Sequence, residues 1–499
     1  MAVEAGQRGE VVFLPRVLSL PETLGAIVGS VIGSGIFIVP GMVAREVGSI
    51  GGIASAWVLG GLFSIAGALT LAELAAMLPR AGGPYVYLRA AFGPLPAFLF
   101  GWTEFLVIRA GSVATLAAAF ALYFGQLVPA PEGVAPAYWR MAAAVGAMAI
   151  VAAINVLGTK LSGRVQVVGT ALKVGAIAAM MIGPFVLGEA RLENLAPLWP
   201  ATVDGRLARG MLAAMIGVLW AYDGWVNTAS LAEEVRDPGR NVPRALMLGV
   251  AILVAIYLGL TLVYHSVLPM ERVAAAATEK GSPRIVAADF CGALLGRPGV
   301  VAISLVVMAS TFISLNGNAL AGPRAYFAMA RDGLFPRALG RVHPRYGTPA
   351  AAVIAQAVWS IALTVAGTVL TATPPPTAGL PRPLLSAWGV LHETPLYDLL
   401  YTYVIFGGAV FYALSIASVF VLRVRLPDLP RPYRAWGYPI TPIFYLFSSF
   451  LLMGSMLYQS FAPSVAGLAI IAAGLPAYLY FRRSGRESGP RSEGDQAAH

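Results

Sequence analysis

The chain consists largely of apolar stretches that are long enough to cross a lipid bilayer. A hydrocarbon core about 30 Å thick requires roughly 20 apolar residues in a helix, and the sequence offers about twelve such stretches. Hydrophobic residues make up 58% of the 499 residues and charged residues only 12%, a balance that excludes an ordinary soluble protein. We therefore expect an all-α integral membrane protein with about twelve transmembrane helices. The expected spans are 22–47, 51–78, 95–127, 138–157, 164–187, 208–233, 243–267, 299–328, 349–371, 400–423, 441–460 and 463–482.

The net charge of +10 is concentrated in alternate connections and in the two tails. The basic groups of the connections are Arg80, Arg89, Lys160, Arg164, Arg236, Arg240, Arg244, Arg331, Arg337, Arg341, Arg345, Arg423, Arg425, Arg431 and Arg434. By the positive-inside rule this pattern places both termini in the cytoplasm, and it argues against nucleic-acid binding. The first twenty residues lack the apolar core of a cleavable signal peptide. We therefore expect an inner or plasma membrane protein that is inserted by its own spans.

The first apolar stretch contains three small residues, Gly33-Ser34-Gly35, well inside a run that begins near Leu24. At about 1.5 Å per residue they lie roughly 15 Å deep, near the middle of the hydrocarbon core. Irregular backbone persists at that depth only where it lines a protein-enclosed cavity. We expect the helix to unwind there, so that the N–H groups of Ser34, Gly35 and Ile36 face a carboxylate. The alternative is a stripe of small residues for close helix packing.

The sixth stretch carries a second interruption, Trp220-Ala221-Tyr222-Asp223-Gly224-Trp225-Val226-Asn227. Breaks at corresponding positions of two halves are typical of carriers built as inverted repeats, with the substrate bound between the halves. The second break therefore favours the cavity over the packing alternative. We expect an N-terminal cytoplasmic tail over 1–21, five-helix repeats over 22–188 and 208–424, helices 11 and 12 over 425–483, and a disordered cytoplasmic tail over 484–499.

Asp223 is a carboxylate near the centre of an apolar span, where it must face a cavity or a partner. It either accepts a hydrogen bond from a substrate ammonium or titrates; the alternatives are a structural pair or a helix-end cap. Trp220 lies three residues earlier, on the same side of a helix, and can close over the substrate. Val31, Gly33 and Tyr222, which belong to the same two interrupted stretches, complete the expected substrate-binding set.

Lys173 lies roughly 13 Å from the cytoplasmic end of its span, which is too deep for a lysine that snorkels to the surface. A buried ammonium there requires carbonyl or carboxylate partners. Ser310 and Thr311 carry hydroxyls in the eighth span that can meet it. We expect Lys173 to bridge the broken first helix and the eighth span as a fixed cation or in a proton-linked role.

Glu104 and Arg109 both lie in the third span. Five residues apart on a straight α-helix, their side chains point about 140° away from each other. We therefore expect each to find its partner on another helix, in a structural network.

The remaining polar groups have simpler interpretations. We expect Glu73, Glu233 and Glu234 to anchor loops or gates at the cytoplasmic side. Asn316 and Asn318 are expected to form hydrogen bonds between helices.

Signatures of enzymes and cofactor sites are missing from the sequence. The four histidines are scattered without metal-ligand spacing, and no phosphate loop or nucleophile elbow occurs. We expect no metal, no cofactor and no enzymatic activity. The single cysteine, Cys291, cannot form an intramolecular disulfide. Two external connections stand out, residues 271–297 as a candidate lid helix and the Pro-rich residues 372–399.

Short motifs, each weak alone, form an ordered set along the chain. They are Gly29-Ser30-Val31-Ile32-Gly33-Ser34-Gly35-Ile36-Phe37, Ala72-Glu73-Leu74 with Gly82-Gly83-Pro84-Tyr85, Trp102-Thr103-Glu104 with Ile108-Arg109, Trp220 to Trp225, Glu233-Glu234 with Pro238, Arg240-Asn241-Val242-Pro243, and Leu315-Asn316-Gly317 with Arg331-Asp332-Gly333. In order and spacing this set resembles the amino acid–polyamine–organocation (APC) superfamily, and most closely its L-amino acid transporter branch, over about residues 20–485.

The resemblance implies a leucine-transporter-like fold, a five-plus-five inverted repeat with broken helices 1 and 6, and amino acid transport without sodium. It implies that N–H groups of Ser34 and Gly35 bind the substrate carboxylate. The substrate ammonium would contact the carbonyls of Val31, Trp220 and Asp223. Lys173 matches the lysine that replaces a sodium ion in this branch.

Two positions depart from the branch, which usually has a phenylalanine-like gate at position 220 and a glycine at position 223. A bulkier gate and an added acid predict small to medium neutral substrates or an extra amine contact. Animal members bind a heavy subunit through an external cysteine; its absence between the third and fourth spans predicts a chain that acts alone. Two alternatives stay open: a proton-coupled carrier of cationic amino acids or polyamines, and an amino-acid-binding membrane sensor.

Overall fold

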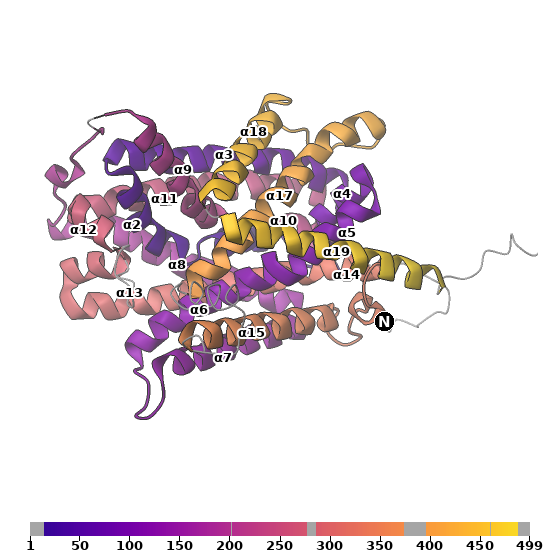
Figure 1. Ribbon diagram of the computed structural model, residues 1–499, viewed down its shortest axis with the longest axis horizontal. Helices are drawn as coiled ribbons and strands as arrows, with labels where there is room; N and C mark the ends of the chain where they lie inside the picture. Colours follow the sequence, from indigo (N-terminus) through magenta and orange to yellow (C-terminus); the bar gives the residue numbers. More distant parts are fainter. Residues whose placement is uncertain (1–13, 201, 277–285, 374–395, 460, 488–499) are drawn as a thin grey trace, which may run out of the picture.

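The computed structural model describes residues 14–200, 202–276, 286–373, 396–459 and 461–487, and it is built from helices (Figure 1). The first part of the chain forms α1 (Leu20–Val31), α2 (Gly35–Val47), α3 (Ile50–Met77), α4 (Pro84–Phe92), α5 (Pro94–Thr103), a π-helical turn η1 (Glu104–Ile108), α6 (Arg109–Leu127), α7 (Pro136–Leu157), α8 (Thr159–Leu187) and η2 (Leu192–Leu195). The second part forms α9 (Gly205–Tyr222), α10 (Asn227–Ser230), η3 (Ala232–Glu234), α11 (Pro238–Val267), α12 (Met270–Ala275), α13 (Val286–Ala321), α14 (Pro323–Arg331), η4 (Arg337–Gly340), α15 (Ala350–Ala372), α17 (Leu396–Arg425), α18 (Ile440–Gln459) and α19 (Phe461–Glu487).

The predicted all-α membrane protein is confirmed by the length and composition of these helices. In the described ranges, ten helices are long and apolar enough to cross a bilayer, and eleven if α1 and α2 are counted as one bent span. The expected sixth span is not among them, because α9 has only 18 residues and these include Arg206 and Arg209. The number of twelve spans therefore stays a prediction.

Two of the expected boundaries shift. The helix of the eighth span begins at Val286, and it is bent at Gly296, whose φ of 61° is not helical. The expected lid region thus contains the short helix α12, which packs against α2, and the start of α13, while residues 277–285 lie outside the described residues. The Pro-rich connection falls mostly on residues 374–395, also outside them. The C-terminal helix α19 continues to Glu487, beyond the limit of 483 that we expected.

Helices of the first half pack against helices of the second half in a regular order. Contacts join α2 with α9, α3 with α11, α6 with α13, and α7 with α15. The core of the molecule lies along these contacts, whereas α18 and α19 run over one side of the bundle (Figure 1). The arrangement brings both interrupted segments, at the α1–α2 and α9–α10 junctions, into the centre of the bundle.

The N-terminal segment closes one end of the bundle, where the connections rich in arginine also lie. We call this end the basic face; it comprises residues 14–18 and the connections around 80–89, 236–244, 331–345 and 423–434. Leu18 forms an isolated bridge with Val235: its N–H donates to the carbonyl of Glu234 at 2.9 Å, and its carbonyl accepts from Arg236 N at 2.8 Å. In Figure 1 α14 lies towards one end of the bundle, and α12 lies at the opposite end.

Acidic side chains hold the loops of the basic face together, as the sequence predicted. Glu233 accepts hydrogen bonds from the backbone N–H groups of Leu14 at 2.7 Å and Ala81 at 2.9 Å. Glu234 forms an ion pair with Arg324 at 2.8 Å, and both side chains are fully buried. The predicted role of these glutamates as loop anchors is therefore confirmed.

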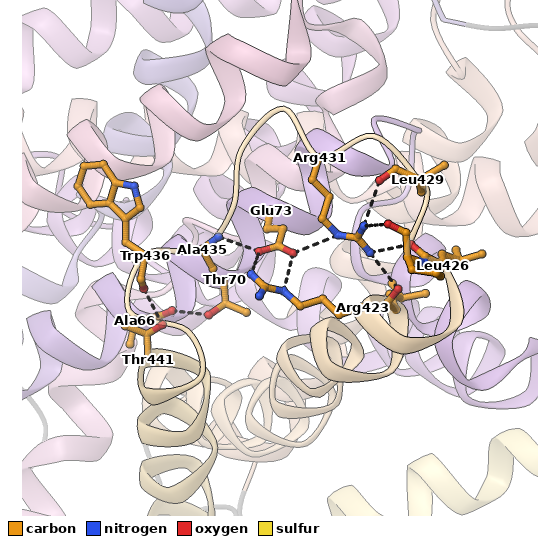
Figure 2. A network of polar contacts seen from close by, with 12 residues as sticks. Ala66, Thr70, Glu73, Arg423, Leu426, Leu429, Arg431, Ala435, Trp436 and Thr441 are labelled. Carbon is orange, nitrogen blue, oxygen red and sulfur yellow. Dashed lines mark hydrogen bonds and ion pairs between the residues drawn. The ribbon is translucent and has the colours of Figure 1, made fainter.

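Glu73 organises a second set of contacts, between α3 and the connection from α17 to α18 (Figure 2). Its carboxylate lies 2.7 Å from Arg423 Nη2 and 3.4 Å from Arg431 Nε, and it accepts from the N–H of Ala435 at 2.7 Å. One buried carboxylate thus fixes the end of α17 and the following loop, so Glu73 is also confirmed as a loop anchor.

Candidate substrate site between two interrupted helices

The first interruption lies between the end of α1 at Val31 and the start of α2 at Gly35, and the two helices are bent by 42°. The N–H of Gly33 turns back to the carbonyl of Val31 at 2.7 Å. The first N–H groups of α2, those of Gly35 and Ile36, have no acceptor in a preceding turn of their own helix, and they lie at its positive dipole end. This end of α2 has the polarity that attracts a carboxylate.

The second interruption begins where α9 ends at Tyr222. Asp223 is extended (φ −65°, ψ 150°), Gly224 has a φ of 116°, and α10 starts at Asn227. A β-carbon at Gly224 would lie 3.2 Å from the Val31 side chain, so this glycine permits the two interruptions to touch. Its positive φ is also one that other residues rarely adopt.

Helices α2 and α9, which flank the two interruptions, approach each other even more closely. A β-carbon built at Gly35 would lie 2.7 Å from the Cα of Ala221. A separation this short is below van der Waals contact, so the start of α2 can lie against α9 only with glycine at position 35.

A small cavity of about 20 Å³ lies at the junction of the two interruptions. Its lining consists of Ser30, Val31, Gly33, Ser34, Gly35, Ser112, Leu116, Trp220, Asp223 and Asn318. Six of the residues that we expected at the substrate are in this set, from both interrupted segments. A cavity of this size has room for about one water molecule and is much smaller than a typical small-molecule pocket of about 300–1,000 Å³, so the two interruptions lie close together in this structure.

Tyr222 does not line this cavity, although we expected it there. Its hydroxyl donates to the carbonyl of Trp57 at 3.2 Å, and its ring packs against the rings of Trp57 and Tyr257. The physical reason is helical: Tyr222 follows Trp220 by two residues, which turns it about 200° around α9. The side chain of Ile36 is also buried outside the lining, so only its N–H group remains a candidate contact.

A tyrosine that the sequence analysis missed connects the two interruptions. The hydroxyl of Tyr257, on α11, lies 3.1 Å from the carbonyl oxygen of Val31 and 2.8 Å from that of Ala221. A hydroxyl has a single proton, so it donates to one of these carbonyls at a time. Tyr257 therefore ties both segments to the same helix, behind the cavity.

Lys173 binds the end of α1 to α13, as predicted. Its ammonium donates to the carbonyl oxygens of Gly29 at 2.9 Å, Ile32 at 2.6 Å and Ser310 at 2.9 Å. The side chain is 3% exposed. Every proton of the ammonium thus has a buried acceptor, which is what a charge at this depth requires.

Of the two hydroxyls expected at Lys173, only Ser310 belongs to this arrangement. Its hydroxyl donates to the carbonyl of Ile32 at 2.9 Å. Thr311 is on another side of α13, where its hydroxyl bonds to the carbonyls of Val307 and Met308 in its own helix. Ser310 meets the ammonium through its backbone carbonyl, whereas the hydroxyl that the ammonium contacts is that of Ser314, 3.2 Å away and one turn further along α13.

The expectation that Glu104 and Arg109 pair with other helices is wrong for Glu104. The two side chains form an ion pair with each other, Oε1 to Nη2 at 2.7 Å. The reason is the π-helical turn η1, in which the N–H of Arg109 bonds to the carbonyl of Glu104. A π turn brings residues five apart onto one face of the helix.

Arg109 also reaches across to α13, where its Nη1 lies 2.6 Å from the Oδ1 of Asn318. The same oxygen accepts from the side-chain amide of Asn227 at 3.4 Å. Asn318 lines the cavity, so its position there is set by an arginine from α6. Asn316 lies elsewhere, 2.8 Å from Gln166 and 3.0 Å from Asn155, so both asparagines form the predicted interhelical hydrogen bonds.

The site therefore combines three features: the start of α2, which is suited to a carboxylate; the acidic residue Asp223; and the ammonium of Lys173, which lies behind the interruption between α1 and α2. Over the described ranges, no group of histidine, cysteine, aspartate and glutamate side chains could hold a metal ion. The cavity between interrupted helices of an all-helical bundle defines a membrane carrier.

Comparison with known proteins gives the family: the chain belongs to the amino acid permease family, whose model matches residues 18–475. It is 30% identical to the serine/threonine exchanger SteT of Bacillus subtilis (strain 168), over 94% of this chain and 98% of SteT. It is 28% identical to the human cystine/glutamate transporter, over 95% of this chain and 86% of that protein. It is 30% identical to the human large neutral amino acids transporter small subunit 2, over 95% of this chain and 82% of that protein. The chain is a membrane permease of the APC superfamily and not an enzyme.

Proposed function

We propose that this chain is a sodium-independent exchanger of small to medium neutral L-amino acids that works by alternating access. The observation that carries the proposal is the ammonium of Lys173, which holds the carbonyls of Gly29 and Ile32 to Ser310. The fixed positive charge of Lys173 holds α1 to α13 at this junction, so no bound metal cation is needed to join them. The serine/threonine exchanger SteT is a relative along nearly the whole length, and the names of the relatives do not favour the cationic or polyamine alternative.

The two halves, 22–188 and 208–424, are proposed to form a five-plus-five inverted repeat. The supporting observation is that helices at equivalent places in the two halves pack against each other: α2 with α9, α3 with α11, α6 with α13 and α7 with α15. A substrate cavity at the centre of such pairs is accessible from either side when one half-bundle rocks against the other.

In the proposed binding mode the carboxylate of the amino acid lies at the start of α2, near the N–H groups of Gly35 and Ile36. Its ammonium lies near the carbonyl oxygens of Val31, Trp220 and Asp223. Two of these carbonyls already accept a hydrogen bond, that of Val31 from Tyr257 and that of Trp220 from the N–H of Asp223. The carbonyl of Trp220 keeps a second lone pair for the ammonium. That of Val31, which also accepts from the N–H of Gly33, has one free when Tyr257 donates to Ala221 instead. The hydroxyl groups of Ser30 and Ser112, which line the cavity, support a substrate with a small side chain.

The basic face is proposed to be cytoplasmic, and the membrane to be the inner or plasma membrane. The supporting observation is the concentration of arginines at this end, in agreement with the positive-inside rule. A cysteine introduced at the exposed Arg341 of a Cys291→Ser variant, tested with a membrane-impermeant thiol reagent in intact and opened cells, checks the orientation. Labelling of intact cells would contradict it.

Counterflow in proteoliposomes tests the proposed activity. Vesicles loaded with unlabelled serine should accumulate labelled serine equally well in sodium and in choline buffers. Alanine and leucine should compete, and arginine and putrescine should not. Accumulation that requires sodium would overturn the sodium-independent mechanism, and binding without counterflow would identify an amino acid sensor.

We also propose that the chain acts without a disulfide-linked partner. One relative is named as a small subunit, but the only cysteine of this chain is Cys291, half-buried on α13. Electrophoresis of membranes with and without reductant should give one and the same band for the chain. A larger band that reductant removes would contradict this proposal.

A further inference from the structure

A second hollow lies at the basic face, between the start of α11 and the connection from α17 to α18. We call it the α11–α18 groove. Its volume is about 550 Å³, and it is lined by Arg16, Arg240, Arg244, Met247, Tyr433 and Trp436, among others. It is separate from the central cavity, with which it shares no lining residue.

Among the described residues that line the groove, positive charges outnumber negative ones. Three guanidinium groups line it, those of Arg16, Arg240 and Arg244, against the one carboxylate of Asp237. Among the described residues none of these three arginines forms an ion pair. Because they face solvent in a common hollow, they favour an anionic ligand.

Neighbouring arginines of the same face behave differently. Arg423 and Arg431 are held by Glu73, and Arg331 lies 3.4 Å from Glu233. The charges of the groove are therefore not simply part of the loop network. Arg240 and Arg244 are four residues apart on α11, so their side chains lie on one face of the helix and can converge on one group.

The groove opens towards the surface that faces lipid. On α11, Leu248 follows the lining residue Met247 and is 51% exposed. Beyond Trp436, which is 67% exposed, Ile440 at the start of α18 is 73% exposed. Large apolar side chains that are this exposed on spanning helices contact acyl chains, so the groove lies at the depth of the headgroups.

One wall of the groove is fixed in advance. Ala435, just before Trp436, donates to Glu73, and the carbonyl of Trp436 accepts from the hydroxyl of Thr441 at 2.9 Å (Figure 2). The loop on this side is therefore ordered by contacts that do not involve the groove itself. A ligand loses less freedom of the protein on binding to such a preformed wall.

We propose that the α11–α18 groove binds the phosphate group of an anionic phospholipid. Arg240 and Arg244 contact the phosphate, Arg16 adds charge from the N-terminal segment, and the ring of Trp436 lies beside the glycerol and upper acyl region. The bound lipid joins α11 to the α17–α18 connection. This site goes beyond the proposed transport activity and does not depend on the identity of the amino acid.

Native mass spectrometry of the full chain, exchanged from phosphatidylcholine with or without phosphatidylglycerol, tests the proposal. The variant Arg240→Gln/Arg244→Gln should bind phosphatidylglycerol about thirtyfold more weakly, the effect of two juxtamembrane positive charges. Arg240→Lys/Arg244→Lys keeps the charge and should keep most of the affinity. The matched control Arg80→Gln/Arg341→Gln removes two exposed arginines of the same face outside the groove and should bind like the unaltered protein.

An equal loss in the control pair would overturn the proposal, because general surface charge would then explain the binding. Displacement of the lipid by inorganic phosphate or glycerol phosphate at equal concentration would also overturn it, in favour of a soluble anion. If the glutamine pair fails to fold, the single variants carry the test, each with about a fivefold loss expected. Unchanged affinity in both single variants would contradict the assignment.

Discussion

Glu104 and Arg109 form an ion pair in which both side chains are 2% exposed. The pair exists because the chain forms a π-helical turn between them. Arg109 also forms a hydrogen bond with Asn318, which lines the central cavity. A local change in helix type therefore positions a cavity residue on another helix. Single π turns occur frequently at functional sites, and this one places Arg109 where it contacts both Glu104 and Asn318.

Removal of the carboxylate from this pair should destabilise the protein strongly. Glu104→Ala leaves the guanidinium of Arg109 buried and uncompensated, which costs about 3–5 kcal/mol. The midpoint of thermal unfolding of the purified protein, followed by fluorescence-detected gel filtration, measures the loss. The exposed pair of Arg45 and Glu46 provides the control, since Glu46→Ala should cost less than about 1 kcal/mol. Equal midpoints for the two variants would show that the buried ion pair contributes no more to stability than the exposed one.

The spans and both interruptions could be predicted because their signals are local. A run of apolar residues, or glycines within one, is read from a few neighbouring positions. The helical period alone places Trp220 and Tyr222 on different faces of α9, so the sequence was sufficient to predict that only one of them lines the cavity.

Other features depend on contacts between distant parts of the chain. Tyr257 and Ser314 were missed because they meet the end of α1 over 226 to 285 residues of sequence. Their helices are apolar on most sides, so the pattern does not indicate which face points to the cavity. The π turn was missed for a related reason: nothing in Glu104–Ile108 alone distinguishes it from an α-helix.

Replacement of Lys173 by alanine should abolish exchange without preventing membrane insertion. The change leaves the carbonyls of Gly29, Ile32 and Ser310 without their common donor. Because a hydrogen bond from a charged group contributes about 1.5–3 kcal/mol and several are lost together, we expect counterflow to fall by at least about a hundredfold. Lys160→Ala is the control, since that lysine is exposed on the same helix and should transport normally. Full activity of the Lys173 variant would show that the fixed charge is not needed.

A side chain at Gly35 should interfere with the contact between α2 and α9. A β-carbon there would lie 2.7 Å from the Cα of Ala221, so the backbone must move. Overpacking of this kind costs about 1–3 kcal/mol, and we expect Gly35→Ala to lower uptake of labelled serine about tenfold or more. Gly175 is a matched control because a β-carbon there meets open space. If Gly35→Ala transports as well as Gly175→Ala, the close approach has no part in the site.

Loss of the hydroxyl of Tyr257 should slow transport while the fold persists. Tyr257→Phe keeps the ring against Trp57 and Tyr222 but removes the hydrogen bond to the carbonyls of Val31 and Ala221. A hydrogen bond of this type contributes about 0.5–1.5 kcal/mol, so we expect a reduction of roughly threefold to tenfold in counterflow. Tyr264→Phe, on the same helix, removes a buried hydroxyl that has no hydrogen-bond partner in the described part of the chain, and it should be active. Equal activity of the two variants would contradict a tethering role for Tyr257.

Replacement of Asp223 separates the effects of size and charge on substrate choice. The side chain lines the cavity beside Trp220, so Asp223→Gly enlarges it and removes the acid. A difference of one or two methylenes in a pocket changes preference by about tenfold or more. We expect leucine to gain on serine by about that factor in competition for labelled serine uptake. Asp223→Asn preserves the volume, and its preference for serine over leucine should match that of the unaltered protein if size decides. A shift of the same extent in Asp223→Asn would instead show that the charge selects the substrate. No shift in either variant would remove Asp223 from the specificity determinants.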